Sequence, residues 1–194
     1  MFCSLNQSYK ITQGIFDLWC RLLSAAPRSL LWLLQPNPTA QANLLREAAA
    51  RGIGAERIVF APKLPMEEHL ARLQLADLAL DTYPVTSHTT ASDALWVGVP
   101  LVTLIGPTFV SRVVASIVRA AGIPELVTES VEDYYRVALE LAAKPARLKK
   151  IKAKLAKDRL SCPLFDAKRF TQDLESMYKR MWEAHRAAKV GHIV

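Results

Sequence analysis

Short apolar runs of strand length alternate with longer segments of helical periodicity along most of this chain. The strand-like runs are Met1 to Ser4, Ser29 to Leu34, Arg57 to Ala61, Leu78 to Leu80, Leu101 to Ile105 and the short pair Leu126-Val127. Continuous apolar runs are expected where a parallel strand is covered on both faces, and proline or glycine ends most of the helical segments between them. Sustained through six rounds, this alternation predicts an α/β fold with a doubly wound, Rossmann-like parallel sheet.

The helical segments continue beyond the last predicted strand. We predict helices over the approximate ranges Thr12 to Ala26, Thr39 to Arg51, Pro65 to Arg72, His88 to Gly98, Phe109 to Ala121, Val131 to Ala143, Pro145 to Leu160 and Asp166 to Ala188. Residues 1–143 are expected to form one Rossmann-like domain. Residues 144–194 are expected to form C-terminal helices that pack on this domain or on a missing N-terminal half, which the blunt start of the first strand suggests.

The chain is basic, with a formal net charge of +7 and a pI of about 9.5, which favours anionic partners. Much of this charge lies in the segment Lys144 to Arg159. Within it, apolar residues recur at helical spacing and predict an amphipathic helix with solvated lysines: Leu148, Ile151, Leu155 and Leu160. Nucleic-acid binding is the minority interpretation, because no interleaved aromatic residues or reading motif accompany the charge.

No apolar run approaches the ~18 residues needed to span a membrane, and the first ten residues lack the regions of a secretory signal. We therefore expect a cytoplasmic protein with no membrane partner. The candidate thiol and imidazole ligands are Cys3, Cys20, Cys162, His69, His88, His185 and His192. Their spacing matches neither a CxxC nor an HExxH pair, which predicts no disulfide framework and no bound metal.

The stretch Asp77 to Gly98 places a strand, a loop of turn-forming residues and a helix in succession. The unpaired amides and the dipole at the start of a helix bind anions, so the helix that opens at His88 is a candidate phosphate site. Thr89 and Thr90 add hydroxyl donors, and Asp93 is placed to accept hydrogen bonds from a ribose diol. The alternative is an ordinary capped helix with an acidic first turn, because Ser, Thr and Asp are preferred at any helix N-terminus.

Ligands of doubly wound sheets bind outside the carboxyl ends of the strands. Four predicted loops leave these ends with polar residues, namely Asn6 to Lys10, Pro62 to Met66, Tyr83 to His88 and Gly106 to Thr108. We expect the four loops to converge on one site.

Several motifs follow one another along the chain in the order of one family. They are FCSLNQSYKI (Phe2 to Ile11), LPMEEHLAR (Leu64 to Arg72), ADLALDTYP (Ala76 to Pro84), SHTTASDALWVGVPLVTLIG (Ser87 to Gly106), SRVVAS (Ser111 to Ser116) and PLFDAKRFTQDLESMYKRMW (Pro163 to Trp182). Together they resemble the C-terminal catalytic half of protein O-GlcNAc transferases, a family that includes bacterial O-GlcNAc transferases and SPINDLY-like proteins. The resemblance implies GT-B architecture, in which two Rossmann-like halves hold the sugar donor between them, with this chain as the nucleotide-sugar-binding half.

The resemblance also implies roles for individual residues. The matched positions are Gln7 and Lys10 for the donor diphosphate, Lys63 and Leu64 for the uracil edge, His69 and Arg72 for the nucleotide-side helix, His88, Thr89 and Thr90 for the phosphate turn, and Asp93 for the ribose. Lys10 is the catalytic candidate, because a lysine and a helix N-terminus stabilise the charge that builds on a departing diphosphate. The alternatives are a solvated Lys10 and surface pairing of His69 and Arg72 with neighbouring glutamates.

Four residues at three places depart from the family pattern. Ser87 stands where close relatives have glycine before the His-Thr-Thr turn, Val85-Thr86 is unusual, and Met66 stands where some members carry lysine. A serine at position 87 either crowds the turn or supplies one more hydroxyl. These departures bear on donor affinity more than on the fold.

The expected function is that of the donor-binding half of a metal-independent glycosyltransferase, which moves GlcNAc from UDP-GlcNAc to Ser and Thr hydroxyls of proteins and releases UDP, without a cofactor. The acceptor groove and the tetratricopeptide repeats typical of the family are expected upstream. The isolated chain is therefore expected to bind nucleotide and to transfer little or nothing. One alternative is a GDP-fucose-dependent O-fucosyltransferase of the SPINDLY branch, which tends to replace the histidine that His88 matches; another is a non-catalytic basic nucleotide- or nucleic-acid-binding module.

Overall fold

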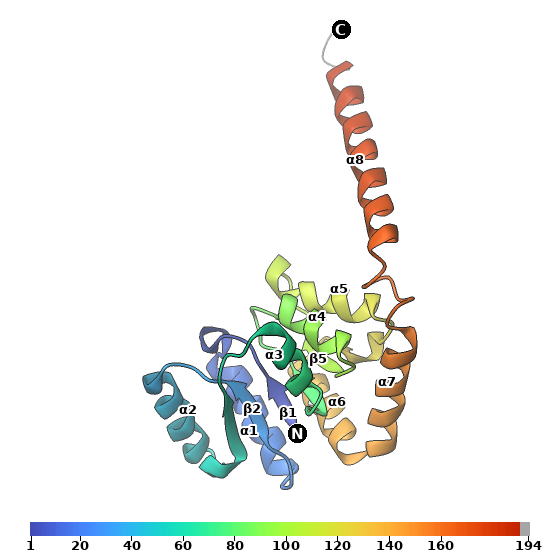
Figure 1. Cartoon of the computed structure of the whole chain (residues 1–194). Helices are drawn as coiled ribbons and strands as arrows, with labels where there is room; N and C mark the ends of the chain where they lie inside the picture. The colour runs from blue at the N-terminus through green and yellow to red at the C-terminus, as the bar shows by residue number, and fades with distance from the viewer. Residues whose placement is uncertain (191–194) are drawn as a thin grey trace.

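A six-stranded parallel sheet forms the centre of the protein (Figure 1), and the computed structural model describes residues 1–190. The strands are β1 (Phe2–Ser4), β2 (Leu31–Leu34), β3 (Ile58–Ala61), β4 (Leu78–Leu80), β5 (Leu101–Leu104) and β6 (Val127–Thr128). All neighbouring strands pair in parallel, in the order β3-β2-β1-β4-β5-β6. This is the order of a Rossmann-like sheet, so the predicted fold class is confirmed.

The inner strands of the sheet are buried on both faces, which explains why they are continuous apolar runs. In β2, Leu31 and Leu33 point to one face and Trp32 points to the other, and all three side chains are buried. The three residues of β4, Leu78 to Leu80, are buried in the same way. The apolar core therefore lies in two layers, one on each side of the sheet.

Helices cover both faces of the sheet, and the last helix extends away from it at the C-terminal end of the chain. They are α1 (Gln13–Ala25), α2 (Pro38–Ala50), α3 (Met66–Leu73), α4 (Thr89–Trp96), α5 (Val113–Ala120), α6 (Val131–Ala143), α7 (Pro145–Asp158) and α8 (Ala167–Val190). Short 3-10 turns occur at η1 (Ser8–Lys10), η2 (Ala55–Arg57), η3 (Phe109–Ser111) and η4 (Pro124–Leu126). Helices α1 and α6 contact each other on one face, and α3, α4 and α5 contact one another in succession on the other face (Figure 1).

The helix predicted from Phe109 to Ala121 is divided into η3 and α5. Thr108 and Ser111 form a capping box around η3, and the carbonyl oxygen of Ser111 accepts a hydrogen bond of 3.1 Å from the backbone N–H of Gly106. That carbonyl is directed back to the loop, and α5 begins only after Arg112. The prediction of one continuous helix was therefore wrong.

The basic helix α7 packs on the domain through its apolar stripe. Ile151 and Leu155 are buried and Leu148 is partly buried against the core, as predicted. Leu160 is 77% exposed because α7 ends at Asp158, so including Leu160 in the stripe was wrong. Salt bridges from Lys144 and Arg147 to Glu140 connect the start of α7 to α6.

Helix α8 projects away from the rest of the protein (Figure 1). Its large apolar side chains are between 55% and 65% exposed, namely Phe170, Met177, Tyr178, Met181 and Trp182. Met177, Tyr178, Met181 and Trp182 are spaced i, i+1, i+4 and i+5, and Phe170 precedes Met177 by seven residues, so the five side chains lie along one side of the helix. The packing of this segment on another part of a longer protein stays a prediction.

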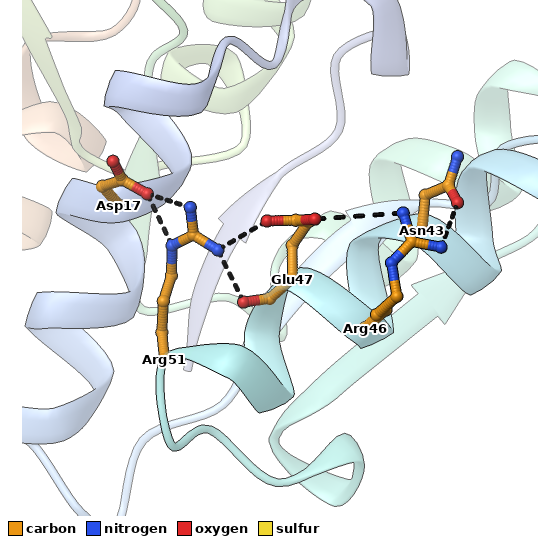
Figure 2. A network of polar contacts seen from close by, with 5 residues as sticks. All are labelled: Asp17, Asn43, Arg46, Glu47 and Arg51. Atoms are coloured by element: carbon orange, nitrogen blue, oxygen red, sulfur yellow. Dashed lines mark hydrogen bonds and ion pairs between the residues drawn. The ribbon is translucent and has the colours of Figure 1, made fainter.

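A polar network connects α1 to the end of α2 (Figure 2). Arg51 donates hydrogen bonds of 2.5 Å to Asp17 on α1, and of 2.8 Å and 2.7 Å to the carboxylate and carbonyl oxygens of Glu47 on α2. The chain leaves α2 at Arg51, so the network fixes the exit of this helix against its neighbour. Asp17 and Glu47 are about half exposed, and we expect the network to contribute only modestly to stability.

The three thiols, of Cys3, Cys20 and Cys162, are buried and unpaired with one another. Burial raises the pKa of Cys3 to about 12 and that of Cys20 to about 11, which keeps these two thiols protonated near neutral pH. None of the helices in residues 1–190 has the length and apolar character that a membrane crossing requires.

Candidate functional site

The strand order reverses between β1 and β4, and a small cavity lined by Asn6, Ser87 and Thr90 lies where these two strands end. We call this place the crevice, and it is where doubly wound sheets bind ligands. The chain leaves β1 toward α1 on one face and leaves β4 toward α4 on the other (Figure 1). The two loops therefore separate at this edge, with η1 on one side and the start of α4 on the other. Both predicted phosphate-contacting segments lie here.

Hydrogen bonds join the loops that follow β1, β4 and β5. The Lys10 ammonium donates a bond of 3.0 Å to the carbonyl oxygen of Thr86, and Asn6 Nδ2 donates one of 2.7 Å to Ser87 Oγ. The backbone N–H and the hydroxyl of Thr86 both donate to the carbonyl oxygen of Val110, at 3.1 Å and 2.5 Å. The loops predicted after β1 and β4 thus meet, and η3, which directly follows the predicted loop Gly106 to Thr108, is bonded to the β4 loop.

The fourth predicted loop, Pro62 to Met66, is exposed along its length. Within the described part of the chain, it forms no hydrogen bond to the other three loops. It leads into α3, which contacts α4 beside the crevice.

Helix α4 begins without a side-chain cap. Its N-cap residue is His88, and the interpretation of Thr89, Thr90 and Asp93 as an ordinary capped N-terminus was wrong. In residues 1–190, the Thr89 and Thr90 amides donate no hydrogen bond to a protein acceptor. Helix α2 differs, because the side chain of Asn37 accepts a bond of 2.8 Å at its start. The first turn of α4 therefore has free donors at the crevice, which can bind an anion.

His69 on α3 lies near Asp93 on α4, and Arg72 lies beside His69 on the same helix. Arg72 Nη2 lies 3.3 Å from His69 Nδ1, and no ion pair to Glu67 or Glu68 is present in the described residues. Burial lowers the pKa of His69, the Arg72 charge lowers it further, and Asp93 opposes both effects. Burial raises the pKa of Asp93, against the opposing effect of His69. The contact between α3 and α4 thus brings an imidazole and a carboxyl group near each other, with a guanidinium beside the imidazole.

A buried carboxylate lies beneath the β4 loop. Asp81 accepts hydrogen bonds from the backbone N–H of Thr82 (3.0 Å), from the backbone N–H and hydroxyl of Ser87 (2.8 Å and 2.7 Å) and from the hydroxyl of Thr103 (2.6 Å). Complete burial raises its pKa to about 6, although these four donors favour the charged form. The carboxylate therefore anchors the β4 loop to the end of the sheet.

The Ser87 side chain points into the protein. Of the two effects expected of it, crowding of the turn or an additional hydroxyl group, the structure shows the second. Its hydroxyl donates to Asp81 and accepts from Asn6, and the residue is 1% exposed. No non-glycine residue in the described structure has a positive φ, so Ser87 adopts an ordinary conformation. It supplies an internal hydroxyl and leaves the surface of the turn to His88 and Thr89, which are exposed.

Comparison with known proteins identifies the family that has this arrangement. The family model described as "Glycosyl transferase family 41" matches residues 1–174. The chain belongs to glycosyl transferase family 41. The crevice between β1 and β4 is therefore the candidate site of a family 41 glycosyltransferase domain.

Similar proteins support this family membership. The chain is 37% identical over its full length to the UDP-N-acetylglucosamine--peptide N-acetylglucosaminyltransferase of Caenorhabditis elegans, and 37% identical over 95% of its length to the probable enzyme SEC of Arabidopsis thaliana. A solved structure of Thermobaculum terrenum O-GlcNAc transferase, the mutant K341M, superposes with a TM-score of 0.90 at 35% identity over 96% of this chain. The architecture is therefore that of the C-terminal region of a GT-B enzyme.

The family 41 domain described here spans only part of each of these relatives. It covers 17% and 19% of the two curated proteins and 37% of the bacterial chain. Whatever the remaining segments of those proteins contribute lies outside the 194 residues of this sequence.

The remaining predicted site residues of this family 41 domain are solvent-accessible. Gln7 precedes η1 and is exposed, as are Lys63 and Leu64 in the loop after β3. Lys10 is half-buried through its bond to Thr86. These positions leave the side chains accessible to a ligand, and their contacts to a donor stay predictions.

Sequence reasoning missed the roles of Asp81 and Thr103. Asp81 directly follows the apolar strand β4, at the end of a parallel strand where ligand-site residues gather, and this position was the available signal. Thr103 lies within β5 and gave no signal, because a threonine in a strand is common.

In residues 1–190, no three His, Cys, Asp or Glu side chains are grouped so that they could hold a metal ion. The groups predicted to contact the diphosphate are the amides and hydroxyls of Thr89 and Thr90, the Lys10 ammonium and the side chains of Gln7 and His88. This donor set fits the phosphates of a nucleotide.

Proposed function

We propose that this family 41 domain is the donor-binding half of a protein O-linked N-acetylglucosaminyltransferase, which transfers GlcNAc from UDP-GlcNAc to Ser and Thr hydroxyls and releases UDP. The observation that carries the proposal is the uncapped start of α4, whose Thr89 and Thr90 amides are free beside Lys10. The relatives whose printed names describe this activity support the choice of donor and acceptor.

Negative charge builds on the diphosphate as the bond to the sugar breaks. We assign the stabilisation of that charge to the Lys10 ammonium and to the amides and hydroxyls of Thr89 and Thr90, without a metal ion. Fixed donors in a crevice that a ligand closes act in a lower dielectric than water and need little reorganisation during the reaction. Gln7, beside η1, would contact the same diphosphate, and His88 would lie at its other side.

The nucleoside end of the donor is assigned to α3, α4 and the loop after β3. Asp93 would accept hydrogen bonds from the ribose, with His69 and Arg72 beside it on α3. The backbone near Lys63 and Leu64 would read the uracil edge. A lowered pKa keeps His69 neutral near pH 7, so Arg72 supplies the positive charge at this end of the crevice.

The acceptor protein would bind to a second half supplied by a longer chain, which the relatives have the length to provide. We propose that the apolar side of α8 packs on that half, because its large apolar side chains are between 55% and 65% exposed in the described structure. The 194-residue chain is then expected to bind nucleotide but to transfer little sugar. The buried, unpaired thiols support a cytoplasmic location.

Isothermal titration calorimetry of the folded chain with UDP, GDP and pyrophosphate tests the proposal. We expect UDP to bind more tightly than GDP, because the segment near Lys63 and Leu64 is assigned to uracil, and pyrophosphate to bind more weakly than UDP. No heat at millimolar UDP would overturn the assigned site. Tighter binding of GDP would overturn the choice of donor.

A further inference from the structure

We propose that Asp81 is a positioning residue for the diphosphate turn, acting through Ser87 to hold the free amides of α4 and the Lys10 loop in one fixed arrangement. The inference rests on the function proposed above. It assigns a role to a side chain that has no access to the ligand, because Asp81 is fully buried.

The carboxylate of Asp81 links the strands to the turn. Its Oδ2 accepts the hydroxyl of Thr103 at 2.6 Å, and its Oδ1 accepts the backbone N–H and hydroxyl of Ser87 at 2.8 Å and 2.7 Å. Thr103 belongs to β5, and Ser87 immediately precedes the N-cap residue of α4. The Asp81 side chain thus fixes the position of the turn relative to strand β5.

Ser87 extends this link to the other side of the crevice. Its hydroxyl accepts a bond of 2.7 Å from Asn6, which is buried and lies directly before the predicted ligand Gln7. A hydrogen-bonded series therefore runs from Asn6 through Ser87 to Asp81 and joins the loops after β1 and β4. These are the loops that carry the Lys10 ammonium and the free amides.

Burying the carboxylate of Asp81 costs folding free energy, and the structure buries such a group at this position alone among those described. Among residues 1–188, for which side-chain burial is described, it is the only Asp, Glu, Lys, Arg or His side chain that is buried. Taking a carboxylate out of water destabilises a fold unless hydrogen bonds compensate, and an apolar side chain would fill the same space without that cost. Its donors come from the turn and from the strand beneath it, which matches a role in ordering the turn before ligand arrives.

The test compares Ser87→Ala with Thr128→Val. The first removes the hydroxyl that joins Asn6 to Asp81. The second removes a similarly buried hydroxyl, which donates 2.8 Å to the carbonyl oxygen of Thr103, one step away from the carboxylate. We expect both to lower the melting temperature, and only Ser87→Ala to raise the Kd for UDP, by about tenfold. Asp81→Asn, which retains the shape but loses acceptor capacity, is expected to raise it at least as much.

The outcomes are measured by calorimetry with UDP and by amide chemical shifts of the ligand-free proteins. Shifts at Thr89 and Thr90 in Ser87→Ala, absent in Thr128→Val, support the inference if the Kd rises with them. Equal UDP affinity in Ser87→Ala and the parent protein would overturn it, as would affinity losses that follow melting temperature in both variants. If the parent protein binds no UDP, the proposed function fails; amide shifts confined to Ser87→Ala would then still identify Asp81 as the residue that orders the turn.

Discussion

The ammonium group of Lys10 donates a hydrogen bond of 3.0 Å to the carbonyl oxygen of Thr86, across 76 positions of sequence. The bond holds the cation against the loop that leads into α4, beside the free amides of its first turn. A carbonyl oxygen is a weaker partner for an ammonium than a phosphate oxygen. A diphosphate would therefore meet a lysine that is already in place and need only replace its present acceptor.

Lys10→Met is expected to weaken UDP binding by about tenfold to a hundredfold, because it removes a charge-assisted hydrogen bond to the diphosphate and retains the length of the side chain. Calorimetry gives the Kd, and the melting temperature should change little. Lys149→Met on the exposed face of α7 is the matched control for loss of one positive charge. Equal affinity losses in both variants would indicate that only net charge attracts the nucleotide.

Asp93→Asn is expected to weaken UDP binding about tenfold and to leave pyrophosphate binding unchanged, because an amide accepts hydrogen bonds from ribose hydroxyls less strongly than a carboxylate does. Titrations with the two ligands separate the contributions of ribose and diphosphate. Lys10→Met should weaken both. A parallel loss of pyrophosphate binding in Asp93→Asn would contradict the ribose assignment.

The stability of the protein should depend on pH through Asp81. Burial raises its pKa from 3.8 to about 6, so the folded state holds the proton more tightly than the unfolded state does. Its stabilising contribution is then fully present below about pH 4 and is lost as the pH rises through about 6. Relative to Asp81→Asn, the free energy of unfolding should fall by about 3 kcal/mol between these limits, since each unit of pKa shift corresponds to about 1.4 kcal/mol. Urea denaturation at several pH values measures this difference, and a difference that rises with pH would contradict the assigned direction.

Gly106→Ala should destabilise the protein, and Gly14→Ala should not. A Cβ at position 106 would lie 2.6 Å from Ser111 Oγ and 2.8 Å from Ser111 Cβ, whereas one at position 14 meets nothing within 4 Å. We expect Gly106→Ala to cost about 1–3 kcal/mol through overpacking, and Gly14→Ala in α1 to gain about 0.5–1 kcal/mol from helix propensity. Thermal denaturation of both variants tests the comparison. An unchanged melting temperature in Gly106→Ala would mean that the loop after β5 can rearrange to accommodate the added Cβ, and would contradict the prediction.

Replacing Met177, Met181 and Trp182 of α8 by alanine should leave the melting temperature within about 1 °C of the parent value, because these exposed side chains bury little on the domain and alanine favours helix. Leu155→Ala on α7 is the comparison, since that leucine is 4% exposed and its truncation should cost about 2–5 kcal/mol. A comparable loss in the α8 variant would show that this helix packs on the domain in solution.

The strands were readable from the sequence because parallel strands covered on both faces are uninterrupted apolar runs, as in Leu31 to Leu34. Helix ends were less predictable. The break at Arg112 depends on the side-chain hydrogen bonds of Thr108 and Ser111, and the end of α7 leaves Leu160 exposed although its spacing fits the stripe. Local hydrogen bonds decide such boundaries, and periodicity does not report them.

The location of the site could be predicted from the sequence, but its hydrogen bonds could be predicted only in part. Loops after parallel strands share one edge of the sheet, so the meeting of the β1, β4 and β5 loops follows from the fold. The bond from Lys10 ends on a backbone carbonyl, which has no residue-type signature. Thr89 and Thr90 are residue types typical of caps, and only the backbone of His88, with φ −129° and ψ −96°, places them inside the helix.

The open first turn of α4 has a thermodynamic consequence. Side-chain caps of the kind that Asn37 supplies to α2 typically stabilise a helix by about 1 kcal/mol, and α4 lacks such a cap. A bound anion would itself complete the helix, so occupancy and folding are linked through the same two amides. In the ligand-free protein the Thr89 and Thr90 amides should exchange their hydrogens readily because they have no acceptor, although Ser87 and Asp81 hold the turn in place, and these amides should become protected when nucleotide binds.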